Sequence, residues 1–335
     1  MSGQTYRWVR RGKPGTGASG ADHRRRVMDV VGGAERMVVI ASPLITDEEV
    51  GDLVREKGEE GVRFYIFTAT PGRISRGAGT EFPDGSGRSH EEFQAGVAGH
   101  ALIRQSEGAH ARAVLADPFH KPGGLLLTMD VTKDGLDTRR GLMVDLDGRE
   151  TEEAARIMRH VFWERAERER IGRGGAVPCS PLGAARETRG RAVLQTTPGH
   201  ATIQESVDRM LKGGREKIIV SNPMWDPKSG MIERLCAMSE EGADVTVITK
   251  KTEEPIHPME RMRDAGISVV AFKRLHARAV ATEHEAVVMS ANMDDGIKDG
   301  IKLGIRLDGD RAKGVIGELQ KWAAMPEFEL GTKSK

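Results

Sequence analysis

A five-residue string, His-Ala-Arg-Ala-Val, occurs twice in this chain of 335 residues, at 110–114 and again at 276–280. Each copy opens a short alternation of apolar residues, which predicts a buried strand. A carboxylate follows each arginine after four residues, as Asp117 in the first copy and Glu283 in the second. A lone histidine on a strand is usually structural or exposed, but two copies with matching surroundings indicate an internal duplication. The chain is therefore expected to fold as two similar halves.

The duplication extends well beyond the repeated string. Residues 31–40 are echoed by residues 211–220, and both segments predict a helix end, a glycine turn and a buried strand. The alternation of strands and helices predicts the α/β class, with largely parallel or mixed sheets flanked by helices. The matching segments that follow are strands at 63–68 and 244–249, strands at 100–104 and 267–272, strands at 125–127 and 286–289, and one closing amphipathic helix in each copy.

The segment between the copies, residues 171–191, is rich in Gly, Pro and Arg and is typical of a linker. We place the boundary so that residues 1–184 form the N-terminal repeat and residues 185–335 the C-terminal repeat. The N-terminal repeat includes a basic arm at residues 6–11, for which two interpretations stay open. It is either an arm that contacts polyanions, or a frayed terminus or edge strand that merely solvates its charges.

The first copy also carries an inserted loop at residues 70–88, which has no counterpart in the second. Long loops often serve as lids or binding loops, although a plain flexible excursion is an equal alternative. Three arginines, Arg73, Arg76 and Arg88, make the insertion a candidate contact for a ligand that carries phosphate.

A second short motif follows an apolar run in each copy, Thr128-Met129-Asp130 in the first and Ser290-Ala291-Asn292 in the second. The combined spacing resembles the phospholipase D superfamily, whose motif is His-x-Lys, four residues, Asp, and then Gly-Ser-x-Asn. That motif is normally present twice per active site. In this chain arginine replaces both lysines, Glu283 replaces one aspartate and Met289 replaces the motif glycine.

The resemblance implies two tandem phospholipase D-like repeats packed about a pseudo-twofold axis, with an active site completed within one chain. It implies phosphodiester chemistry through a phosphohistidine, without a metal or another cofactor. It also assigns His110 as the nucleophile and His276 as the general acid, because the N-terminal histidine commonly attacks in related enzymes. The intact Ser290 and Asn292 of the second copy favour the opposite order.

Paired motifs suit a phosphodiester, because the site must neutralise the phosphate oxygens, supply a nucleophile and protonate the leaving oxygen. Side chains two residues apart on a strand share a face, so each histidine should point the same way as its arginine. Arginine stays charged and binds phosphate bidentately, whereas its bulk can misplace the phosphorus. The candidate residues are catalytic His110 and His276, phosphate-binding Arg112, Arg278, Thr128, Ser290 and Asn292, and supporting carboxylates Asp117, Glu283 and Asp130.

Composition bears on the partners, the location and the origin of the protein rather than on its reaction. The formal net charge of +1 gives no global attraction to nucleic acid or anionic membranes, although local basic patches remain open. No apolar run reaches the length of a membrane span and residues 1–13 lack a signal-peptide core, so a cytoplasmic protein is expected. The two cysteines predict neither a metal site nor a disulfide framework. The chain has two asparagines and many Arg and Glu residues, a composition that favours a thermophilic origin.

Three functions follow from these features. The first is a phosphodiesterase acting on nucleic acid, DNA or RNA, because the arginines of the insertion, the linker and the arm favour a polyanion. The second is a protein that binds phosphate or nucleic acid without turnover, and the third is a phospholipid hydrolase or transferase. The oligomeric state is left open.

Overall fold

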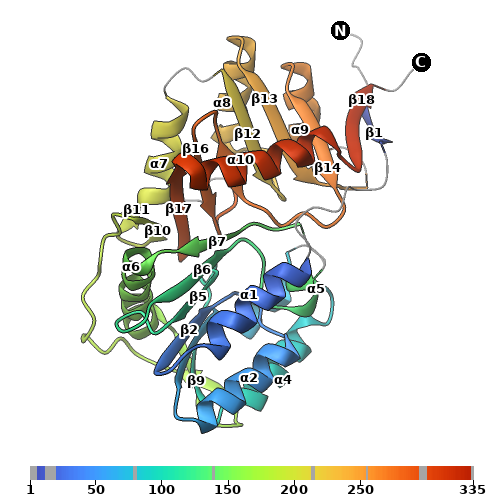
Figure 1. The fold of residues 1–335 in the computed structure, drawn as a ribbon. Helices are drawn as coiled ribbons and strands as arrows, with labels where there is room; N and C mark the ends of the chain where they lie inside the picture. The colour runs from blue at the N-terminus through green and yellow to red at the C-terminus, as the bar shows by residue number, and fades with distance from the viewer. Residues whose placement is uncertain are drawn as a thin grey trace.

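Two mixed β-sheets form the centre of the molecule, one above the other in Figure 1. The computed structural model describes residues 6–11, 20–77, 81–137, 140–212, 216–253, 256–293 and 300–332. The eight-stranded sheet runs in the order β7 (Met143–Leu146), β6 (Gly123–Leu127), β5 (Ala113–Ala116), β2 (Met37–Ala41), β3 (Arg63–Ala69), β4 (Ala101–Ser106), β8 (Arg168–Arg170) and β9 (Ala176–Pro178).

The ten-stranded sheet belongs mainly to the second copy. Its order is β1 (Tyr6–Arg10), β18 (Phe328–Thr332), β14 (Ser268–Phe272), β13 (Asp244–Lys250), β12 (Lys217–Asn222), β15 (Ala279–Ala281), β16 (Glu285–Met289), β17 (Lys302–Asp308), β10 (Val193–Thr197) and β11 (His200–Ala201).

The six central strands of the two sheets have the same topology. The order β7-β6-β5-β2-β3-β4 in the first matches β17-β16-β15-β12-β13-β14 in the second. Among these six central strands of each sheet, the first three along the chain pair in parallel, and the last three are joined by antiparallel pairing. The expectation of two tandem α/β repeats with mixed sheets is confirmed.

Helices cover the outer face of each sheet and also enter the space between the sheets. Helices α1, α2 and α4 pack on the first sheet, and α7, α8 and α9 on the second, while α6 and α10 contribute to the shared core. The described ranges contain no helix that is long and apolar enough to cross a membrane. The helices are α1 (Gly20–Gly32), α2 (Glu48–Glu59), α3 (Pro71–Arg76), α4 (Ser86–Val97), α5 (Lys133–Asp137), α6 (Gly148–His160), the π-helix η1 (Val161–Arg165), α7 (Thr202–Leu211), α8 (Gly230–Glu240), α9 (His257–Asp264) and α10 (Gly309–Ala324).

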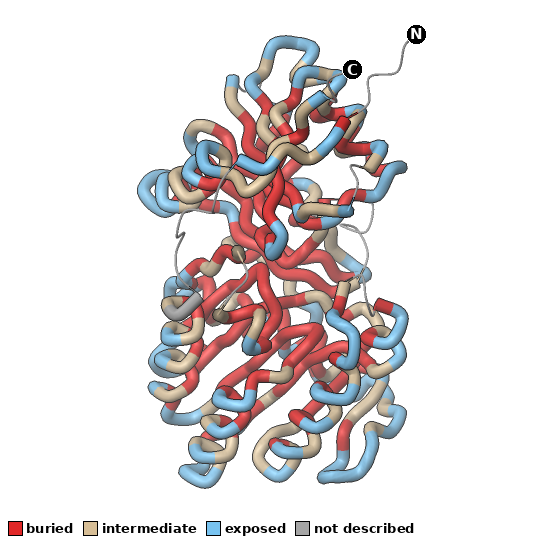
Figure 2. Tube along the Cα trace, turned by 90° about the vertical axis from the view of Figure 1, so that its right-hand side faces the viewer, coloured by how far each residue is buried: buried red, intermediate tan, exposed pale blue. Residues whose placement is uncertain are grey.

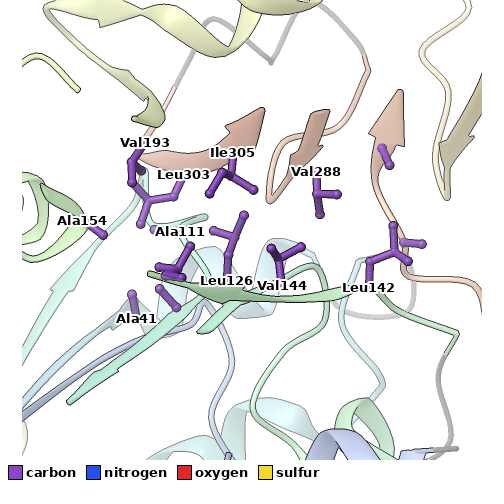
Figure 3. Close-up of a cluster of buried hydrophobic side chains, with 14 of the residues drawn as sticks. Ala41, Ala111, Leu126, Leu142, Val144, Ala154, Val193, Val288, Leu303 and Ile305 are labelled. Atoms are coloured by element: carbon purple, nitrogen blue, oxygen red, sulfur yellow. The ribbon is translucent and has the colours of Figure 1, made fainter. Parts of the chain in front are cut away.

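One hydrophobic core joins the two halves. Leu126 and Val144 of the first sheet and Val288 and Leu303 of the second point toward one another across the interface (Figure 3). The neighbouring residues on each strand point outward, because side chains alternate along a strand: Leu125, for example, packs under the outer helices. Figure 2 shows that buried segments continue from one half into the other. The inner faces of both sheets therefore meet in an apolar, buried interface.

Alanines line much of this interface, including Ala111 and Ala113 of the first repeated string and Ala277 and Ala279 of the second. A small side chain lets two backbones approach closely, so the alanines bring the two strings near the axis that relates the halves. The repeated string is thus a packing motif as well as a candidate chemical one.

The structure departs from expectation in three segments. The basic arm, expected in the N-terminal repeat, forms β1 and pairs antiparallel with β18 at the edge of the second sheet. The edge-strand interpretation is therefore the one that the structure supports. The expected linker contains the short edge strand β9, and the inserted loop contains α3 and the first turn of α4. Residues 78–80 of the insertion lie outside the described residues.

Candidate active site at the interface of the repeats

Both halves of the motif lie side by side within each repeat. His110 and Arg112 come just before β5, and the second motif of that copy comes just after β6. Because β5 and β6 pair antiparallel, the start of one adjoins the end of the other, and the Leu127 N–H donates to the Arg112 carbonyl at 3.0 Å. The second copy repeats this arrangement with β15 and β16. Each strand begins three residues after its histidine, later than expected.

Main-chain hydrogen bonds fix each histidine to the opposite half of the interface. The His110 N–H donates to the Ile301 carbonyl at 2.9 Å, and the His276 N–H donates to the Arg140 carbonyl at 2.7 Å. Gly300 precedes Ile301, the acceptor of the first of these hydrogen bonds, and has a φ of 75°. A Cβ at Gly300 would lie 2.8 Å from the Gly108 carbonyl oxygen. A glycine is required there by both its backbone conformation and the close approach. The two histidines are therefore anchored to the same interface.

The two motif arginines reach across this interface and are fully buried. Arg112 Nη1 donates to the Ser290 carbonyl at 3.1 Å, and Arg278 Nη1 donates to the Thr128 carbonyl at 2.8 Å. Each arginine thus binds the second motif of the opposite repeat. The pseudo-twofold relation between the halves is visible in these paired hydrogen bonds.

Each arginine also binds the last residue of its own second motif. Arg112 Nε donates to Asp130 Oδ1 at 2.9 Å, and Arg278 Nε donates to Asn292 Oδ1 at 2.6 Å. Asp130 neutralises one buried guanidinium, whereas Asn292 offers the same oxygen without a charge. This is the main chemical difference between the two motif copies.

His276 is oriented by a main-chain carbonyl and faces a carboxylate. Its Nδ1 lies 3.0 Å from the Thr128 carbonyl oxygen, which can only accept, so Nδ1 carries a hydrogen. The Arg278 Nη1 atom, 3.2 Å from the same nitrogen, is then a close neighbour rather than a donor to it. Nε2 lies 3.9 Å from Asp130 Oδ2. Asp130 is therefore the carboxylate that faces the outer nitrogen of this imidazole.

His110 has a different environment, and its pKa is held well below the ordinary value of a histidine. Burial is the main cause, followed by the positive charges of Arg112, Arg73, Lys302 and Arg278. The imidazole is therefore neutral near pH 7. These charged groups come from both repeats, so both repeats contribute to the surroundings of this one ring.

The hydroxyls of Thr128 and Ser290 have main-chain partners. The Leu142 N–H donates to Thr128 Oγ1 at 2.8 Å, and the Leu303 N–H donates to Ser290 Oγ at 3.1 Å. Each hydroxyl ties the end of one strand to its neighbour. The same two residues also contribute their carbonyl oxygens to the interface, and their contact with a phosphate stays a prediction.

The carboxylates of Asp117 and Glu283 lie at the far ends of their strands and bind main-chain N–H groups. Asp117 accepts hydrogen bonds from residues 35–37 at 2.6 to 2.8 Å, and Glu283 accepts one from the Lys217 N–H. Burial raises the pKa of Asp117, but the three N–H donors outweigh it and lower that pKa overall. Both carboxylates therefore fasten one strand to the start of the next, a role different from the expected support of a histidine.

Two residues of the insertion complete the surroundings of His110. Arg73 Nη2 contacts His110 Nε2, and Glu81 Oε1 lies 3.3 Å from the same nitrogen. The sequence marked Arg73 through its place in an arginine-containing insertion, but nothing in the pattern marked Glu81. The other arginines of the insertion point elsewhere, since Arg76 forms an exposed ion pair and Arg88 is exposed.

Among the described side chains, no group of three or more His, Cys, Asp or Glu is arranged to hold a metal ion. The side chains that meet at this interface carry imidazole, guanidinium and carboxylate groups. Two imidazoles, one neutral and one facing a carboxylate, can act as a nucleophile and an acid toward the same bound group.

Comparison with known proteins identifies the fold but not the sequence family. No family model matches the sequence, and no curated protein matches it. The phosphatidylserine synthase of Haemophilus influenzae Rd KW20 superposes with a TM-score of 0.68 at 9% identity, covering 99% of this chain and 88% of the synthase. The polyphosphate kinase of Porphyromonas gingivalis superposes with a TM-score of 0.54 at 15% identity and covers 89% of this chain.

This chain spans about half of that kinase, 47% of its length. A third structure, Nuc from Salmonella typhimurium, described as a phospholipase D family member, has a TM-score of 0.35 at 12% identity. It covers 43% of this chain and 98% of Nuc.

Removing the Asp130 carboxylate should destabilise the protein strongly, because it leaves the Arg112 guanidinium buried without its counter-charge. Asp130→Ala is expected to lower the free energy of unfolding by about 3–5 kcal/mol. Asp130→Asn should cost less, because its amide oxygen can accept from Arg112 as Asn292 accepts from Arg278. Urea unfolding followed by circular dichroism measures both losses.

The matched control is Asp310→Ala, which removes a carboxylate whose side chain is 95% exposed in a surface ion pair. It is expected to leave stability unchanged. A loss for Asp130→Ala no larger than that of the control would show that this carboxylate does not hold Arg112.

Proposed function

We propose that this chain, which has the fold of the phospholipase D superfamily, is a phosphodiesterase that acts through a phosphohistidine. The resemblance expected from the two motifs is confirmed at the level of the fold. The observation that carries the proposal is the convergence of both His-x-Arg segments on one interface, where each arginine binds the other repeat.

In the proposed reaction, His110 Nε2 attacks phosphorus and the bond from phosphorus to the leaving oxygen breaks. The protonated His276 gives its Nε2 proton to that oxygen. Neutral His276 then takes a proton from water, the resulting hydroxide attacks phosphorus, and the bond between phosphorus and His110 breaks. Both imidazoles return to their starting states, so one water is consumed for each ester bond.

The environments of the two imidazoles support this order. A nucleophilic imidazole must be neutral, and the lowered pKa of His110 provides this at neutral pH. A general acid must carry a proton, and Asp130 Oδ2 lies 3.9 Å from His276 Nε2. The sequence left the order open, and this electrostatic difference favours His110 as the nucleophile.

The arginines would hold the phosphate oxygens in the proposed complex. Arg112 Nη2 is buried and makes no hydrogen bond with any residue in the described ranges. A buried donor without a partner is rare, because it forfeits its hydrogen bonds to water. A phosphate oxygen would satisfy it with a charge-assisted hydrogen bond. Arg278 and Asn292 occupy the equivalent place in the second repeat.

We propose nucleic acid as the substrate, on narrower support than the chemistry. Of the three arginine-containing segments, the insertion brings Arg73 to His110, whereas the arm lies in edge strand β1. Arg88 of the same insertion is exposed and is available to a polyanion. Two proteins that superpose with a TM-score above 0.5, a phosphatidylserine synthase and a polyphosphate kinase, do not favour nucleic acid over other substrates.

Trapping the covalent intermediate tests the mechanism. With an activated diester such as bis-p-nitrophenyl phosphate, the wild type and His276→Asn should form a phosphohistidine, and His110→Asn should form none. On esters with poor leaving groups, His276→Asn should be about 10²–10⁴-fold slower than the wild type, because the general acid is lost. Acid quenching followed by mass spectrometry of peptides measures the adduct.

His120→Asn is the matched control, since this histidine pairs with Glu35 near the surface and should behave like the wild type. An adduct in His110→Asn but not in His276→Asn would reverse the roles. No adduct in any protein, with phosphate binding unchanged, would establish the alternative of a binding protein without turnover.

The substrate class is tested by cleavage assays in the presence of EDTA. We expect the protein to cleave at least one of the nucleic acids tested, which are single- and double-stranded DNA and RNA. EDTA should not change the rate of cleavage, because the proposed chemistry uses histidines alone. Phosphatidylcholine should remain intact. Hydrolysis of the lipid without cleavage of any oligonucleotide would contradict the choice of nucleic acid. Tight, salt-sensitive oligonucleotide binding without cleavage would favour the binding function.

A further inference from the structure

The nucleophilic nitrogen of His110 is covered by a carboxylate and a guanidinium from the insertion. Glu81 Oε1 lies 3.3 Å from His110 Nε2, and Glu81 Oε2 lies 2.7 Å from Arg73 Nη2. The same Arg73 nitrogen also contacts His110 Nε2. The three side chains are largely buried, with 13% of His110, 11% of Glu81 and 21% of Arg73 exposed. The atom that must reach phosphorus is therefore blocked by an internal ion pair.

Unsatisfied polar atoms gather around this ion pair. Glu81 Oε1, His110 Nδ1 and Arg112 Nη2 are buried and make no hydrogen bond with the described part of the chain. They belong to three neighbouring residues, because Glu81 and Arg112 both contact His110. Glu81 Oε1 lies beside the His110 ring, and Arg112 Nη1 donates to the His110 carbonyl at 3.2 Å. Most buried polar atoms in proteins have a partner. Several without one at a single place point to a ligand that supplies the missing contacts.

The geometry of Glu81 is that of an anion in a phosphate site. Arginine binds carboxylate and phosphate through the same arrangement of N–H donors. A phosphorus atom poised for attack must lie about 3–3.5 Å from the attacking nitrogen, a position that the Glu81 carboxylate now fills. We propose that Arg73 is a third guanidinium for the substrate phosphate, and that Glu81 holds the place of that phosphate until the substrate displaces it. This inference rests on the proposed function and names two further residues of its site.

The insertion is built so that Glu81 can leave while Arg73 stays. Phe82 is buried in the shared core, and the N–H groups of Glu81 and Phe82 both donate to the Gly77 carbonyl, at 2.9 and 2.8 Å. A Cβ at Gly77 would lie 2.7 Å from Phe82, so the turn is tightly packed. Rotation about the side-chain bonds of Glu81 would release its carboxylate without disturbing this anchor.

Arg73 is held by its own helix and by an aromatic ring. The Arg73 N–H donates to the Thr70 hydroxyl at 3.2 Å, which caps α3, and its guanidinium lies 5.7 Å from the centre of the Phe82 ring. Both contacts are independent of Glu81. When the carboxylate moves away, the guanidinium therefore remains beside His110 and lacks an anion, and the phosphate can take the place that Glu81 leaves.

The inference predicts opposite effects for the two residues on phosphate binding. Glu81→Gln should bind inorganic phosphate at least about tenfold more tightly than the wild type, because the phosphate no longer displaces or faces a carboxylate. Arg73→Ala should bind it about tenfold or more weakly, because a charge-assisted hydrogen bond is lost. Isothermal titration calorimetry of the full chain at fixed ionic strength measures both.

Matched controls change the same charges without touching His110. The first control is Arg76→Ala, since Arg76 lies on the same helix as Arg73 and forms an exposed ion pair. The second is Glu92→Gln, since Glu92 is exposed on α4. Both should bind phosphate like the wild type. Glu81→Ala serves as a second variant, and its binding should be tightened like that of Glu81→Gln, provided that thermal unfolding shows a folded protein.

Unchanged or weaker phosphate binding in folded Glu81→Gln and Glu81→Ala would overturn the role of Glu81, and unchanged binding in Arg73→Ala would overturn that of Arg73. These measurements need no turnover, so the inference and the proposed function can fail separately. Tighter binding in the Glu81 variants without a phosphohistidine would uphold this inference and reject the reaction. A phosphohistidine with unchanged phosphate binding in every variant would do the reverse.

Discussion

Two buried guanidinium groups hold the centre of this molecule together. Arg112 and Arg278 each donate to a main-chain carbonyl of the opposite repeat, and each also binds the second motif of its own repeat. A charge removed from water is costly unless its hydrogen bonds are made, so separating the halves would cost each group its charge-assisted hydrogen bond to the opposite repeat. The residues beside them are the histidines, and the interaction that joins the repeats therefore also brings the two imidazoles to one interface.

The duplicated fold is symmetric, but the chemistry of phosphoryl transfer is not. One imidazole must attack while the other donates a proton, and two identical environments would favour neither order. The asymmetry comes from two differences between the sequences of the copies. Asp130 stands where the second copy has Asn292, and only the first copy carries the insertion with Arg73 and Glu81. The first difference places a carboxylate near His276, and the second surrounds His110 with additional charge.

The repeat, its mixed α/β sheets and the strands that carry the two motif halves could be predicted, because each depends on local patterns that recur in the chain. The partners of individual side chains could not. The spacing of the motifs did not reveal that the hydroxyls of Thr128 and Ser290 accept hydrogen bonds from main-chain N–H groups of the next strand segment, or that their carbonyls bind the arginine of the opposite repeat. The pairing of β1 with β18 joins opposite ends of the chain and leaves no periodic signal. Glu81 reaches His110 through the path of an insertion that periodicity does not determine.

The central claim is that both histidines serve one phosphate site between the repeats. A crystal structure of the protein with bound tungstate, a phosphate analogue, tests it most directly. We expect one tungstate ion with oxygens about 2.6–3.2 Å from Nε2 of both His110 and His276, and with Arg112 Nη2 donating to it. A tungstate bound to one histidine alone, or two ions held separately by the two repeats, would contradict the shared site.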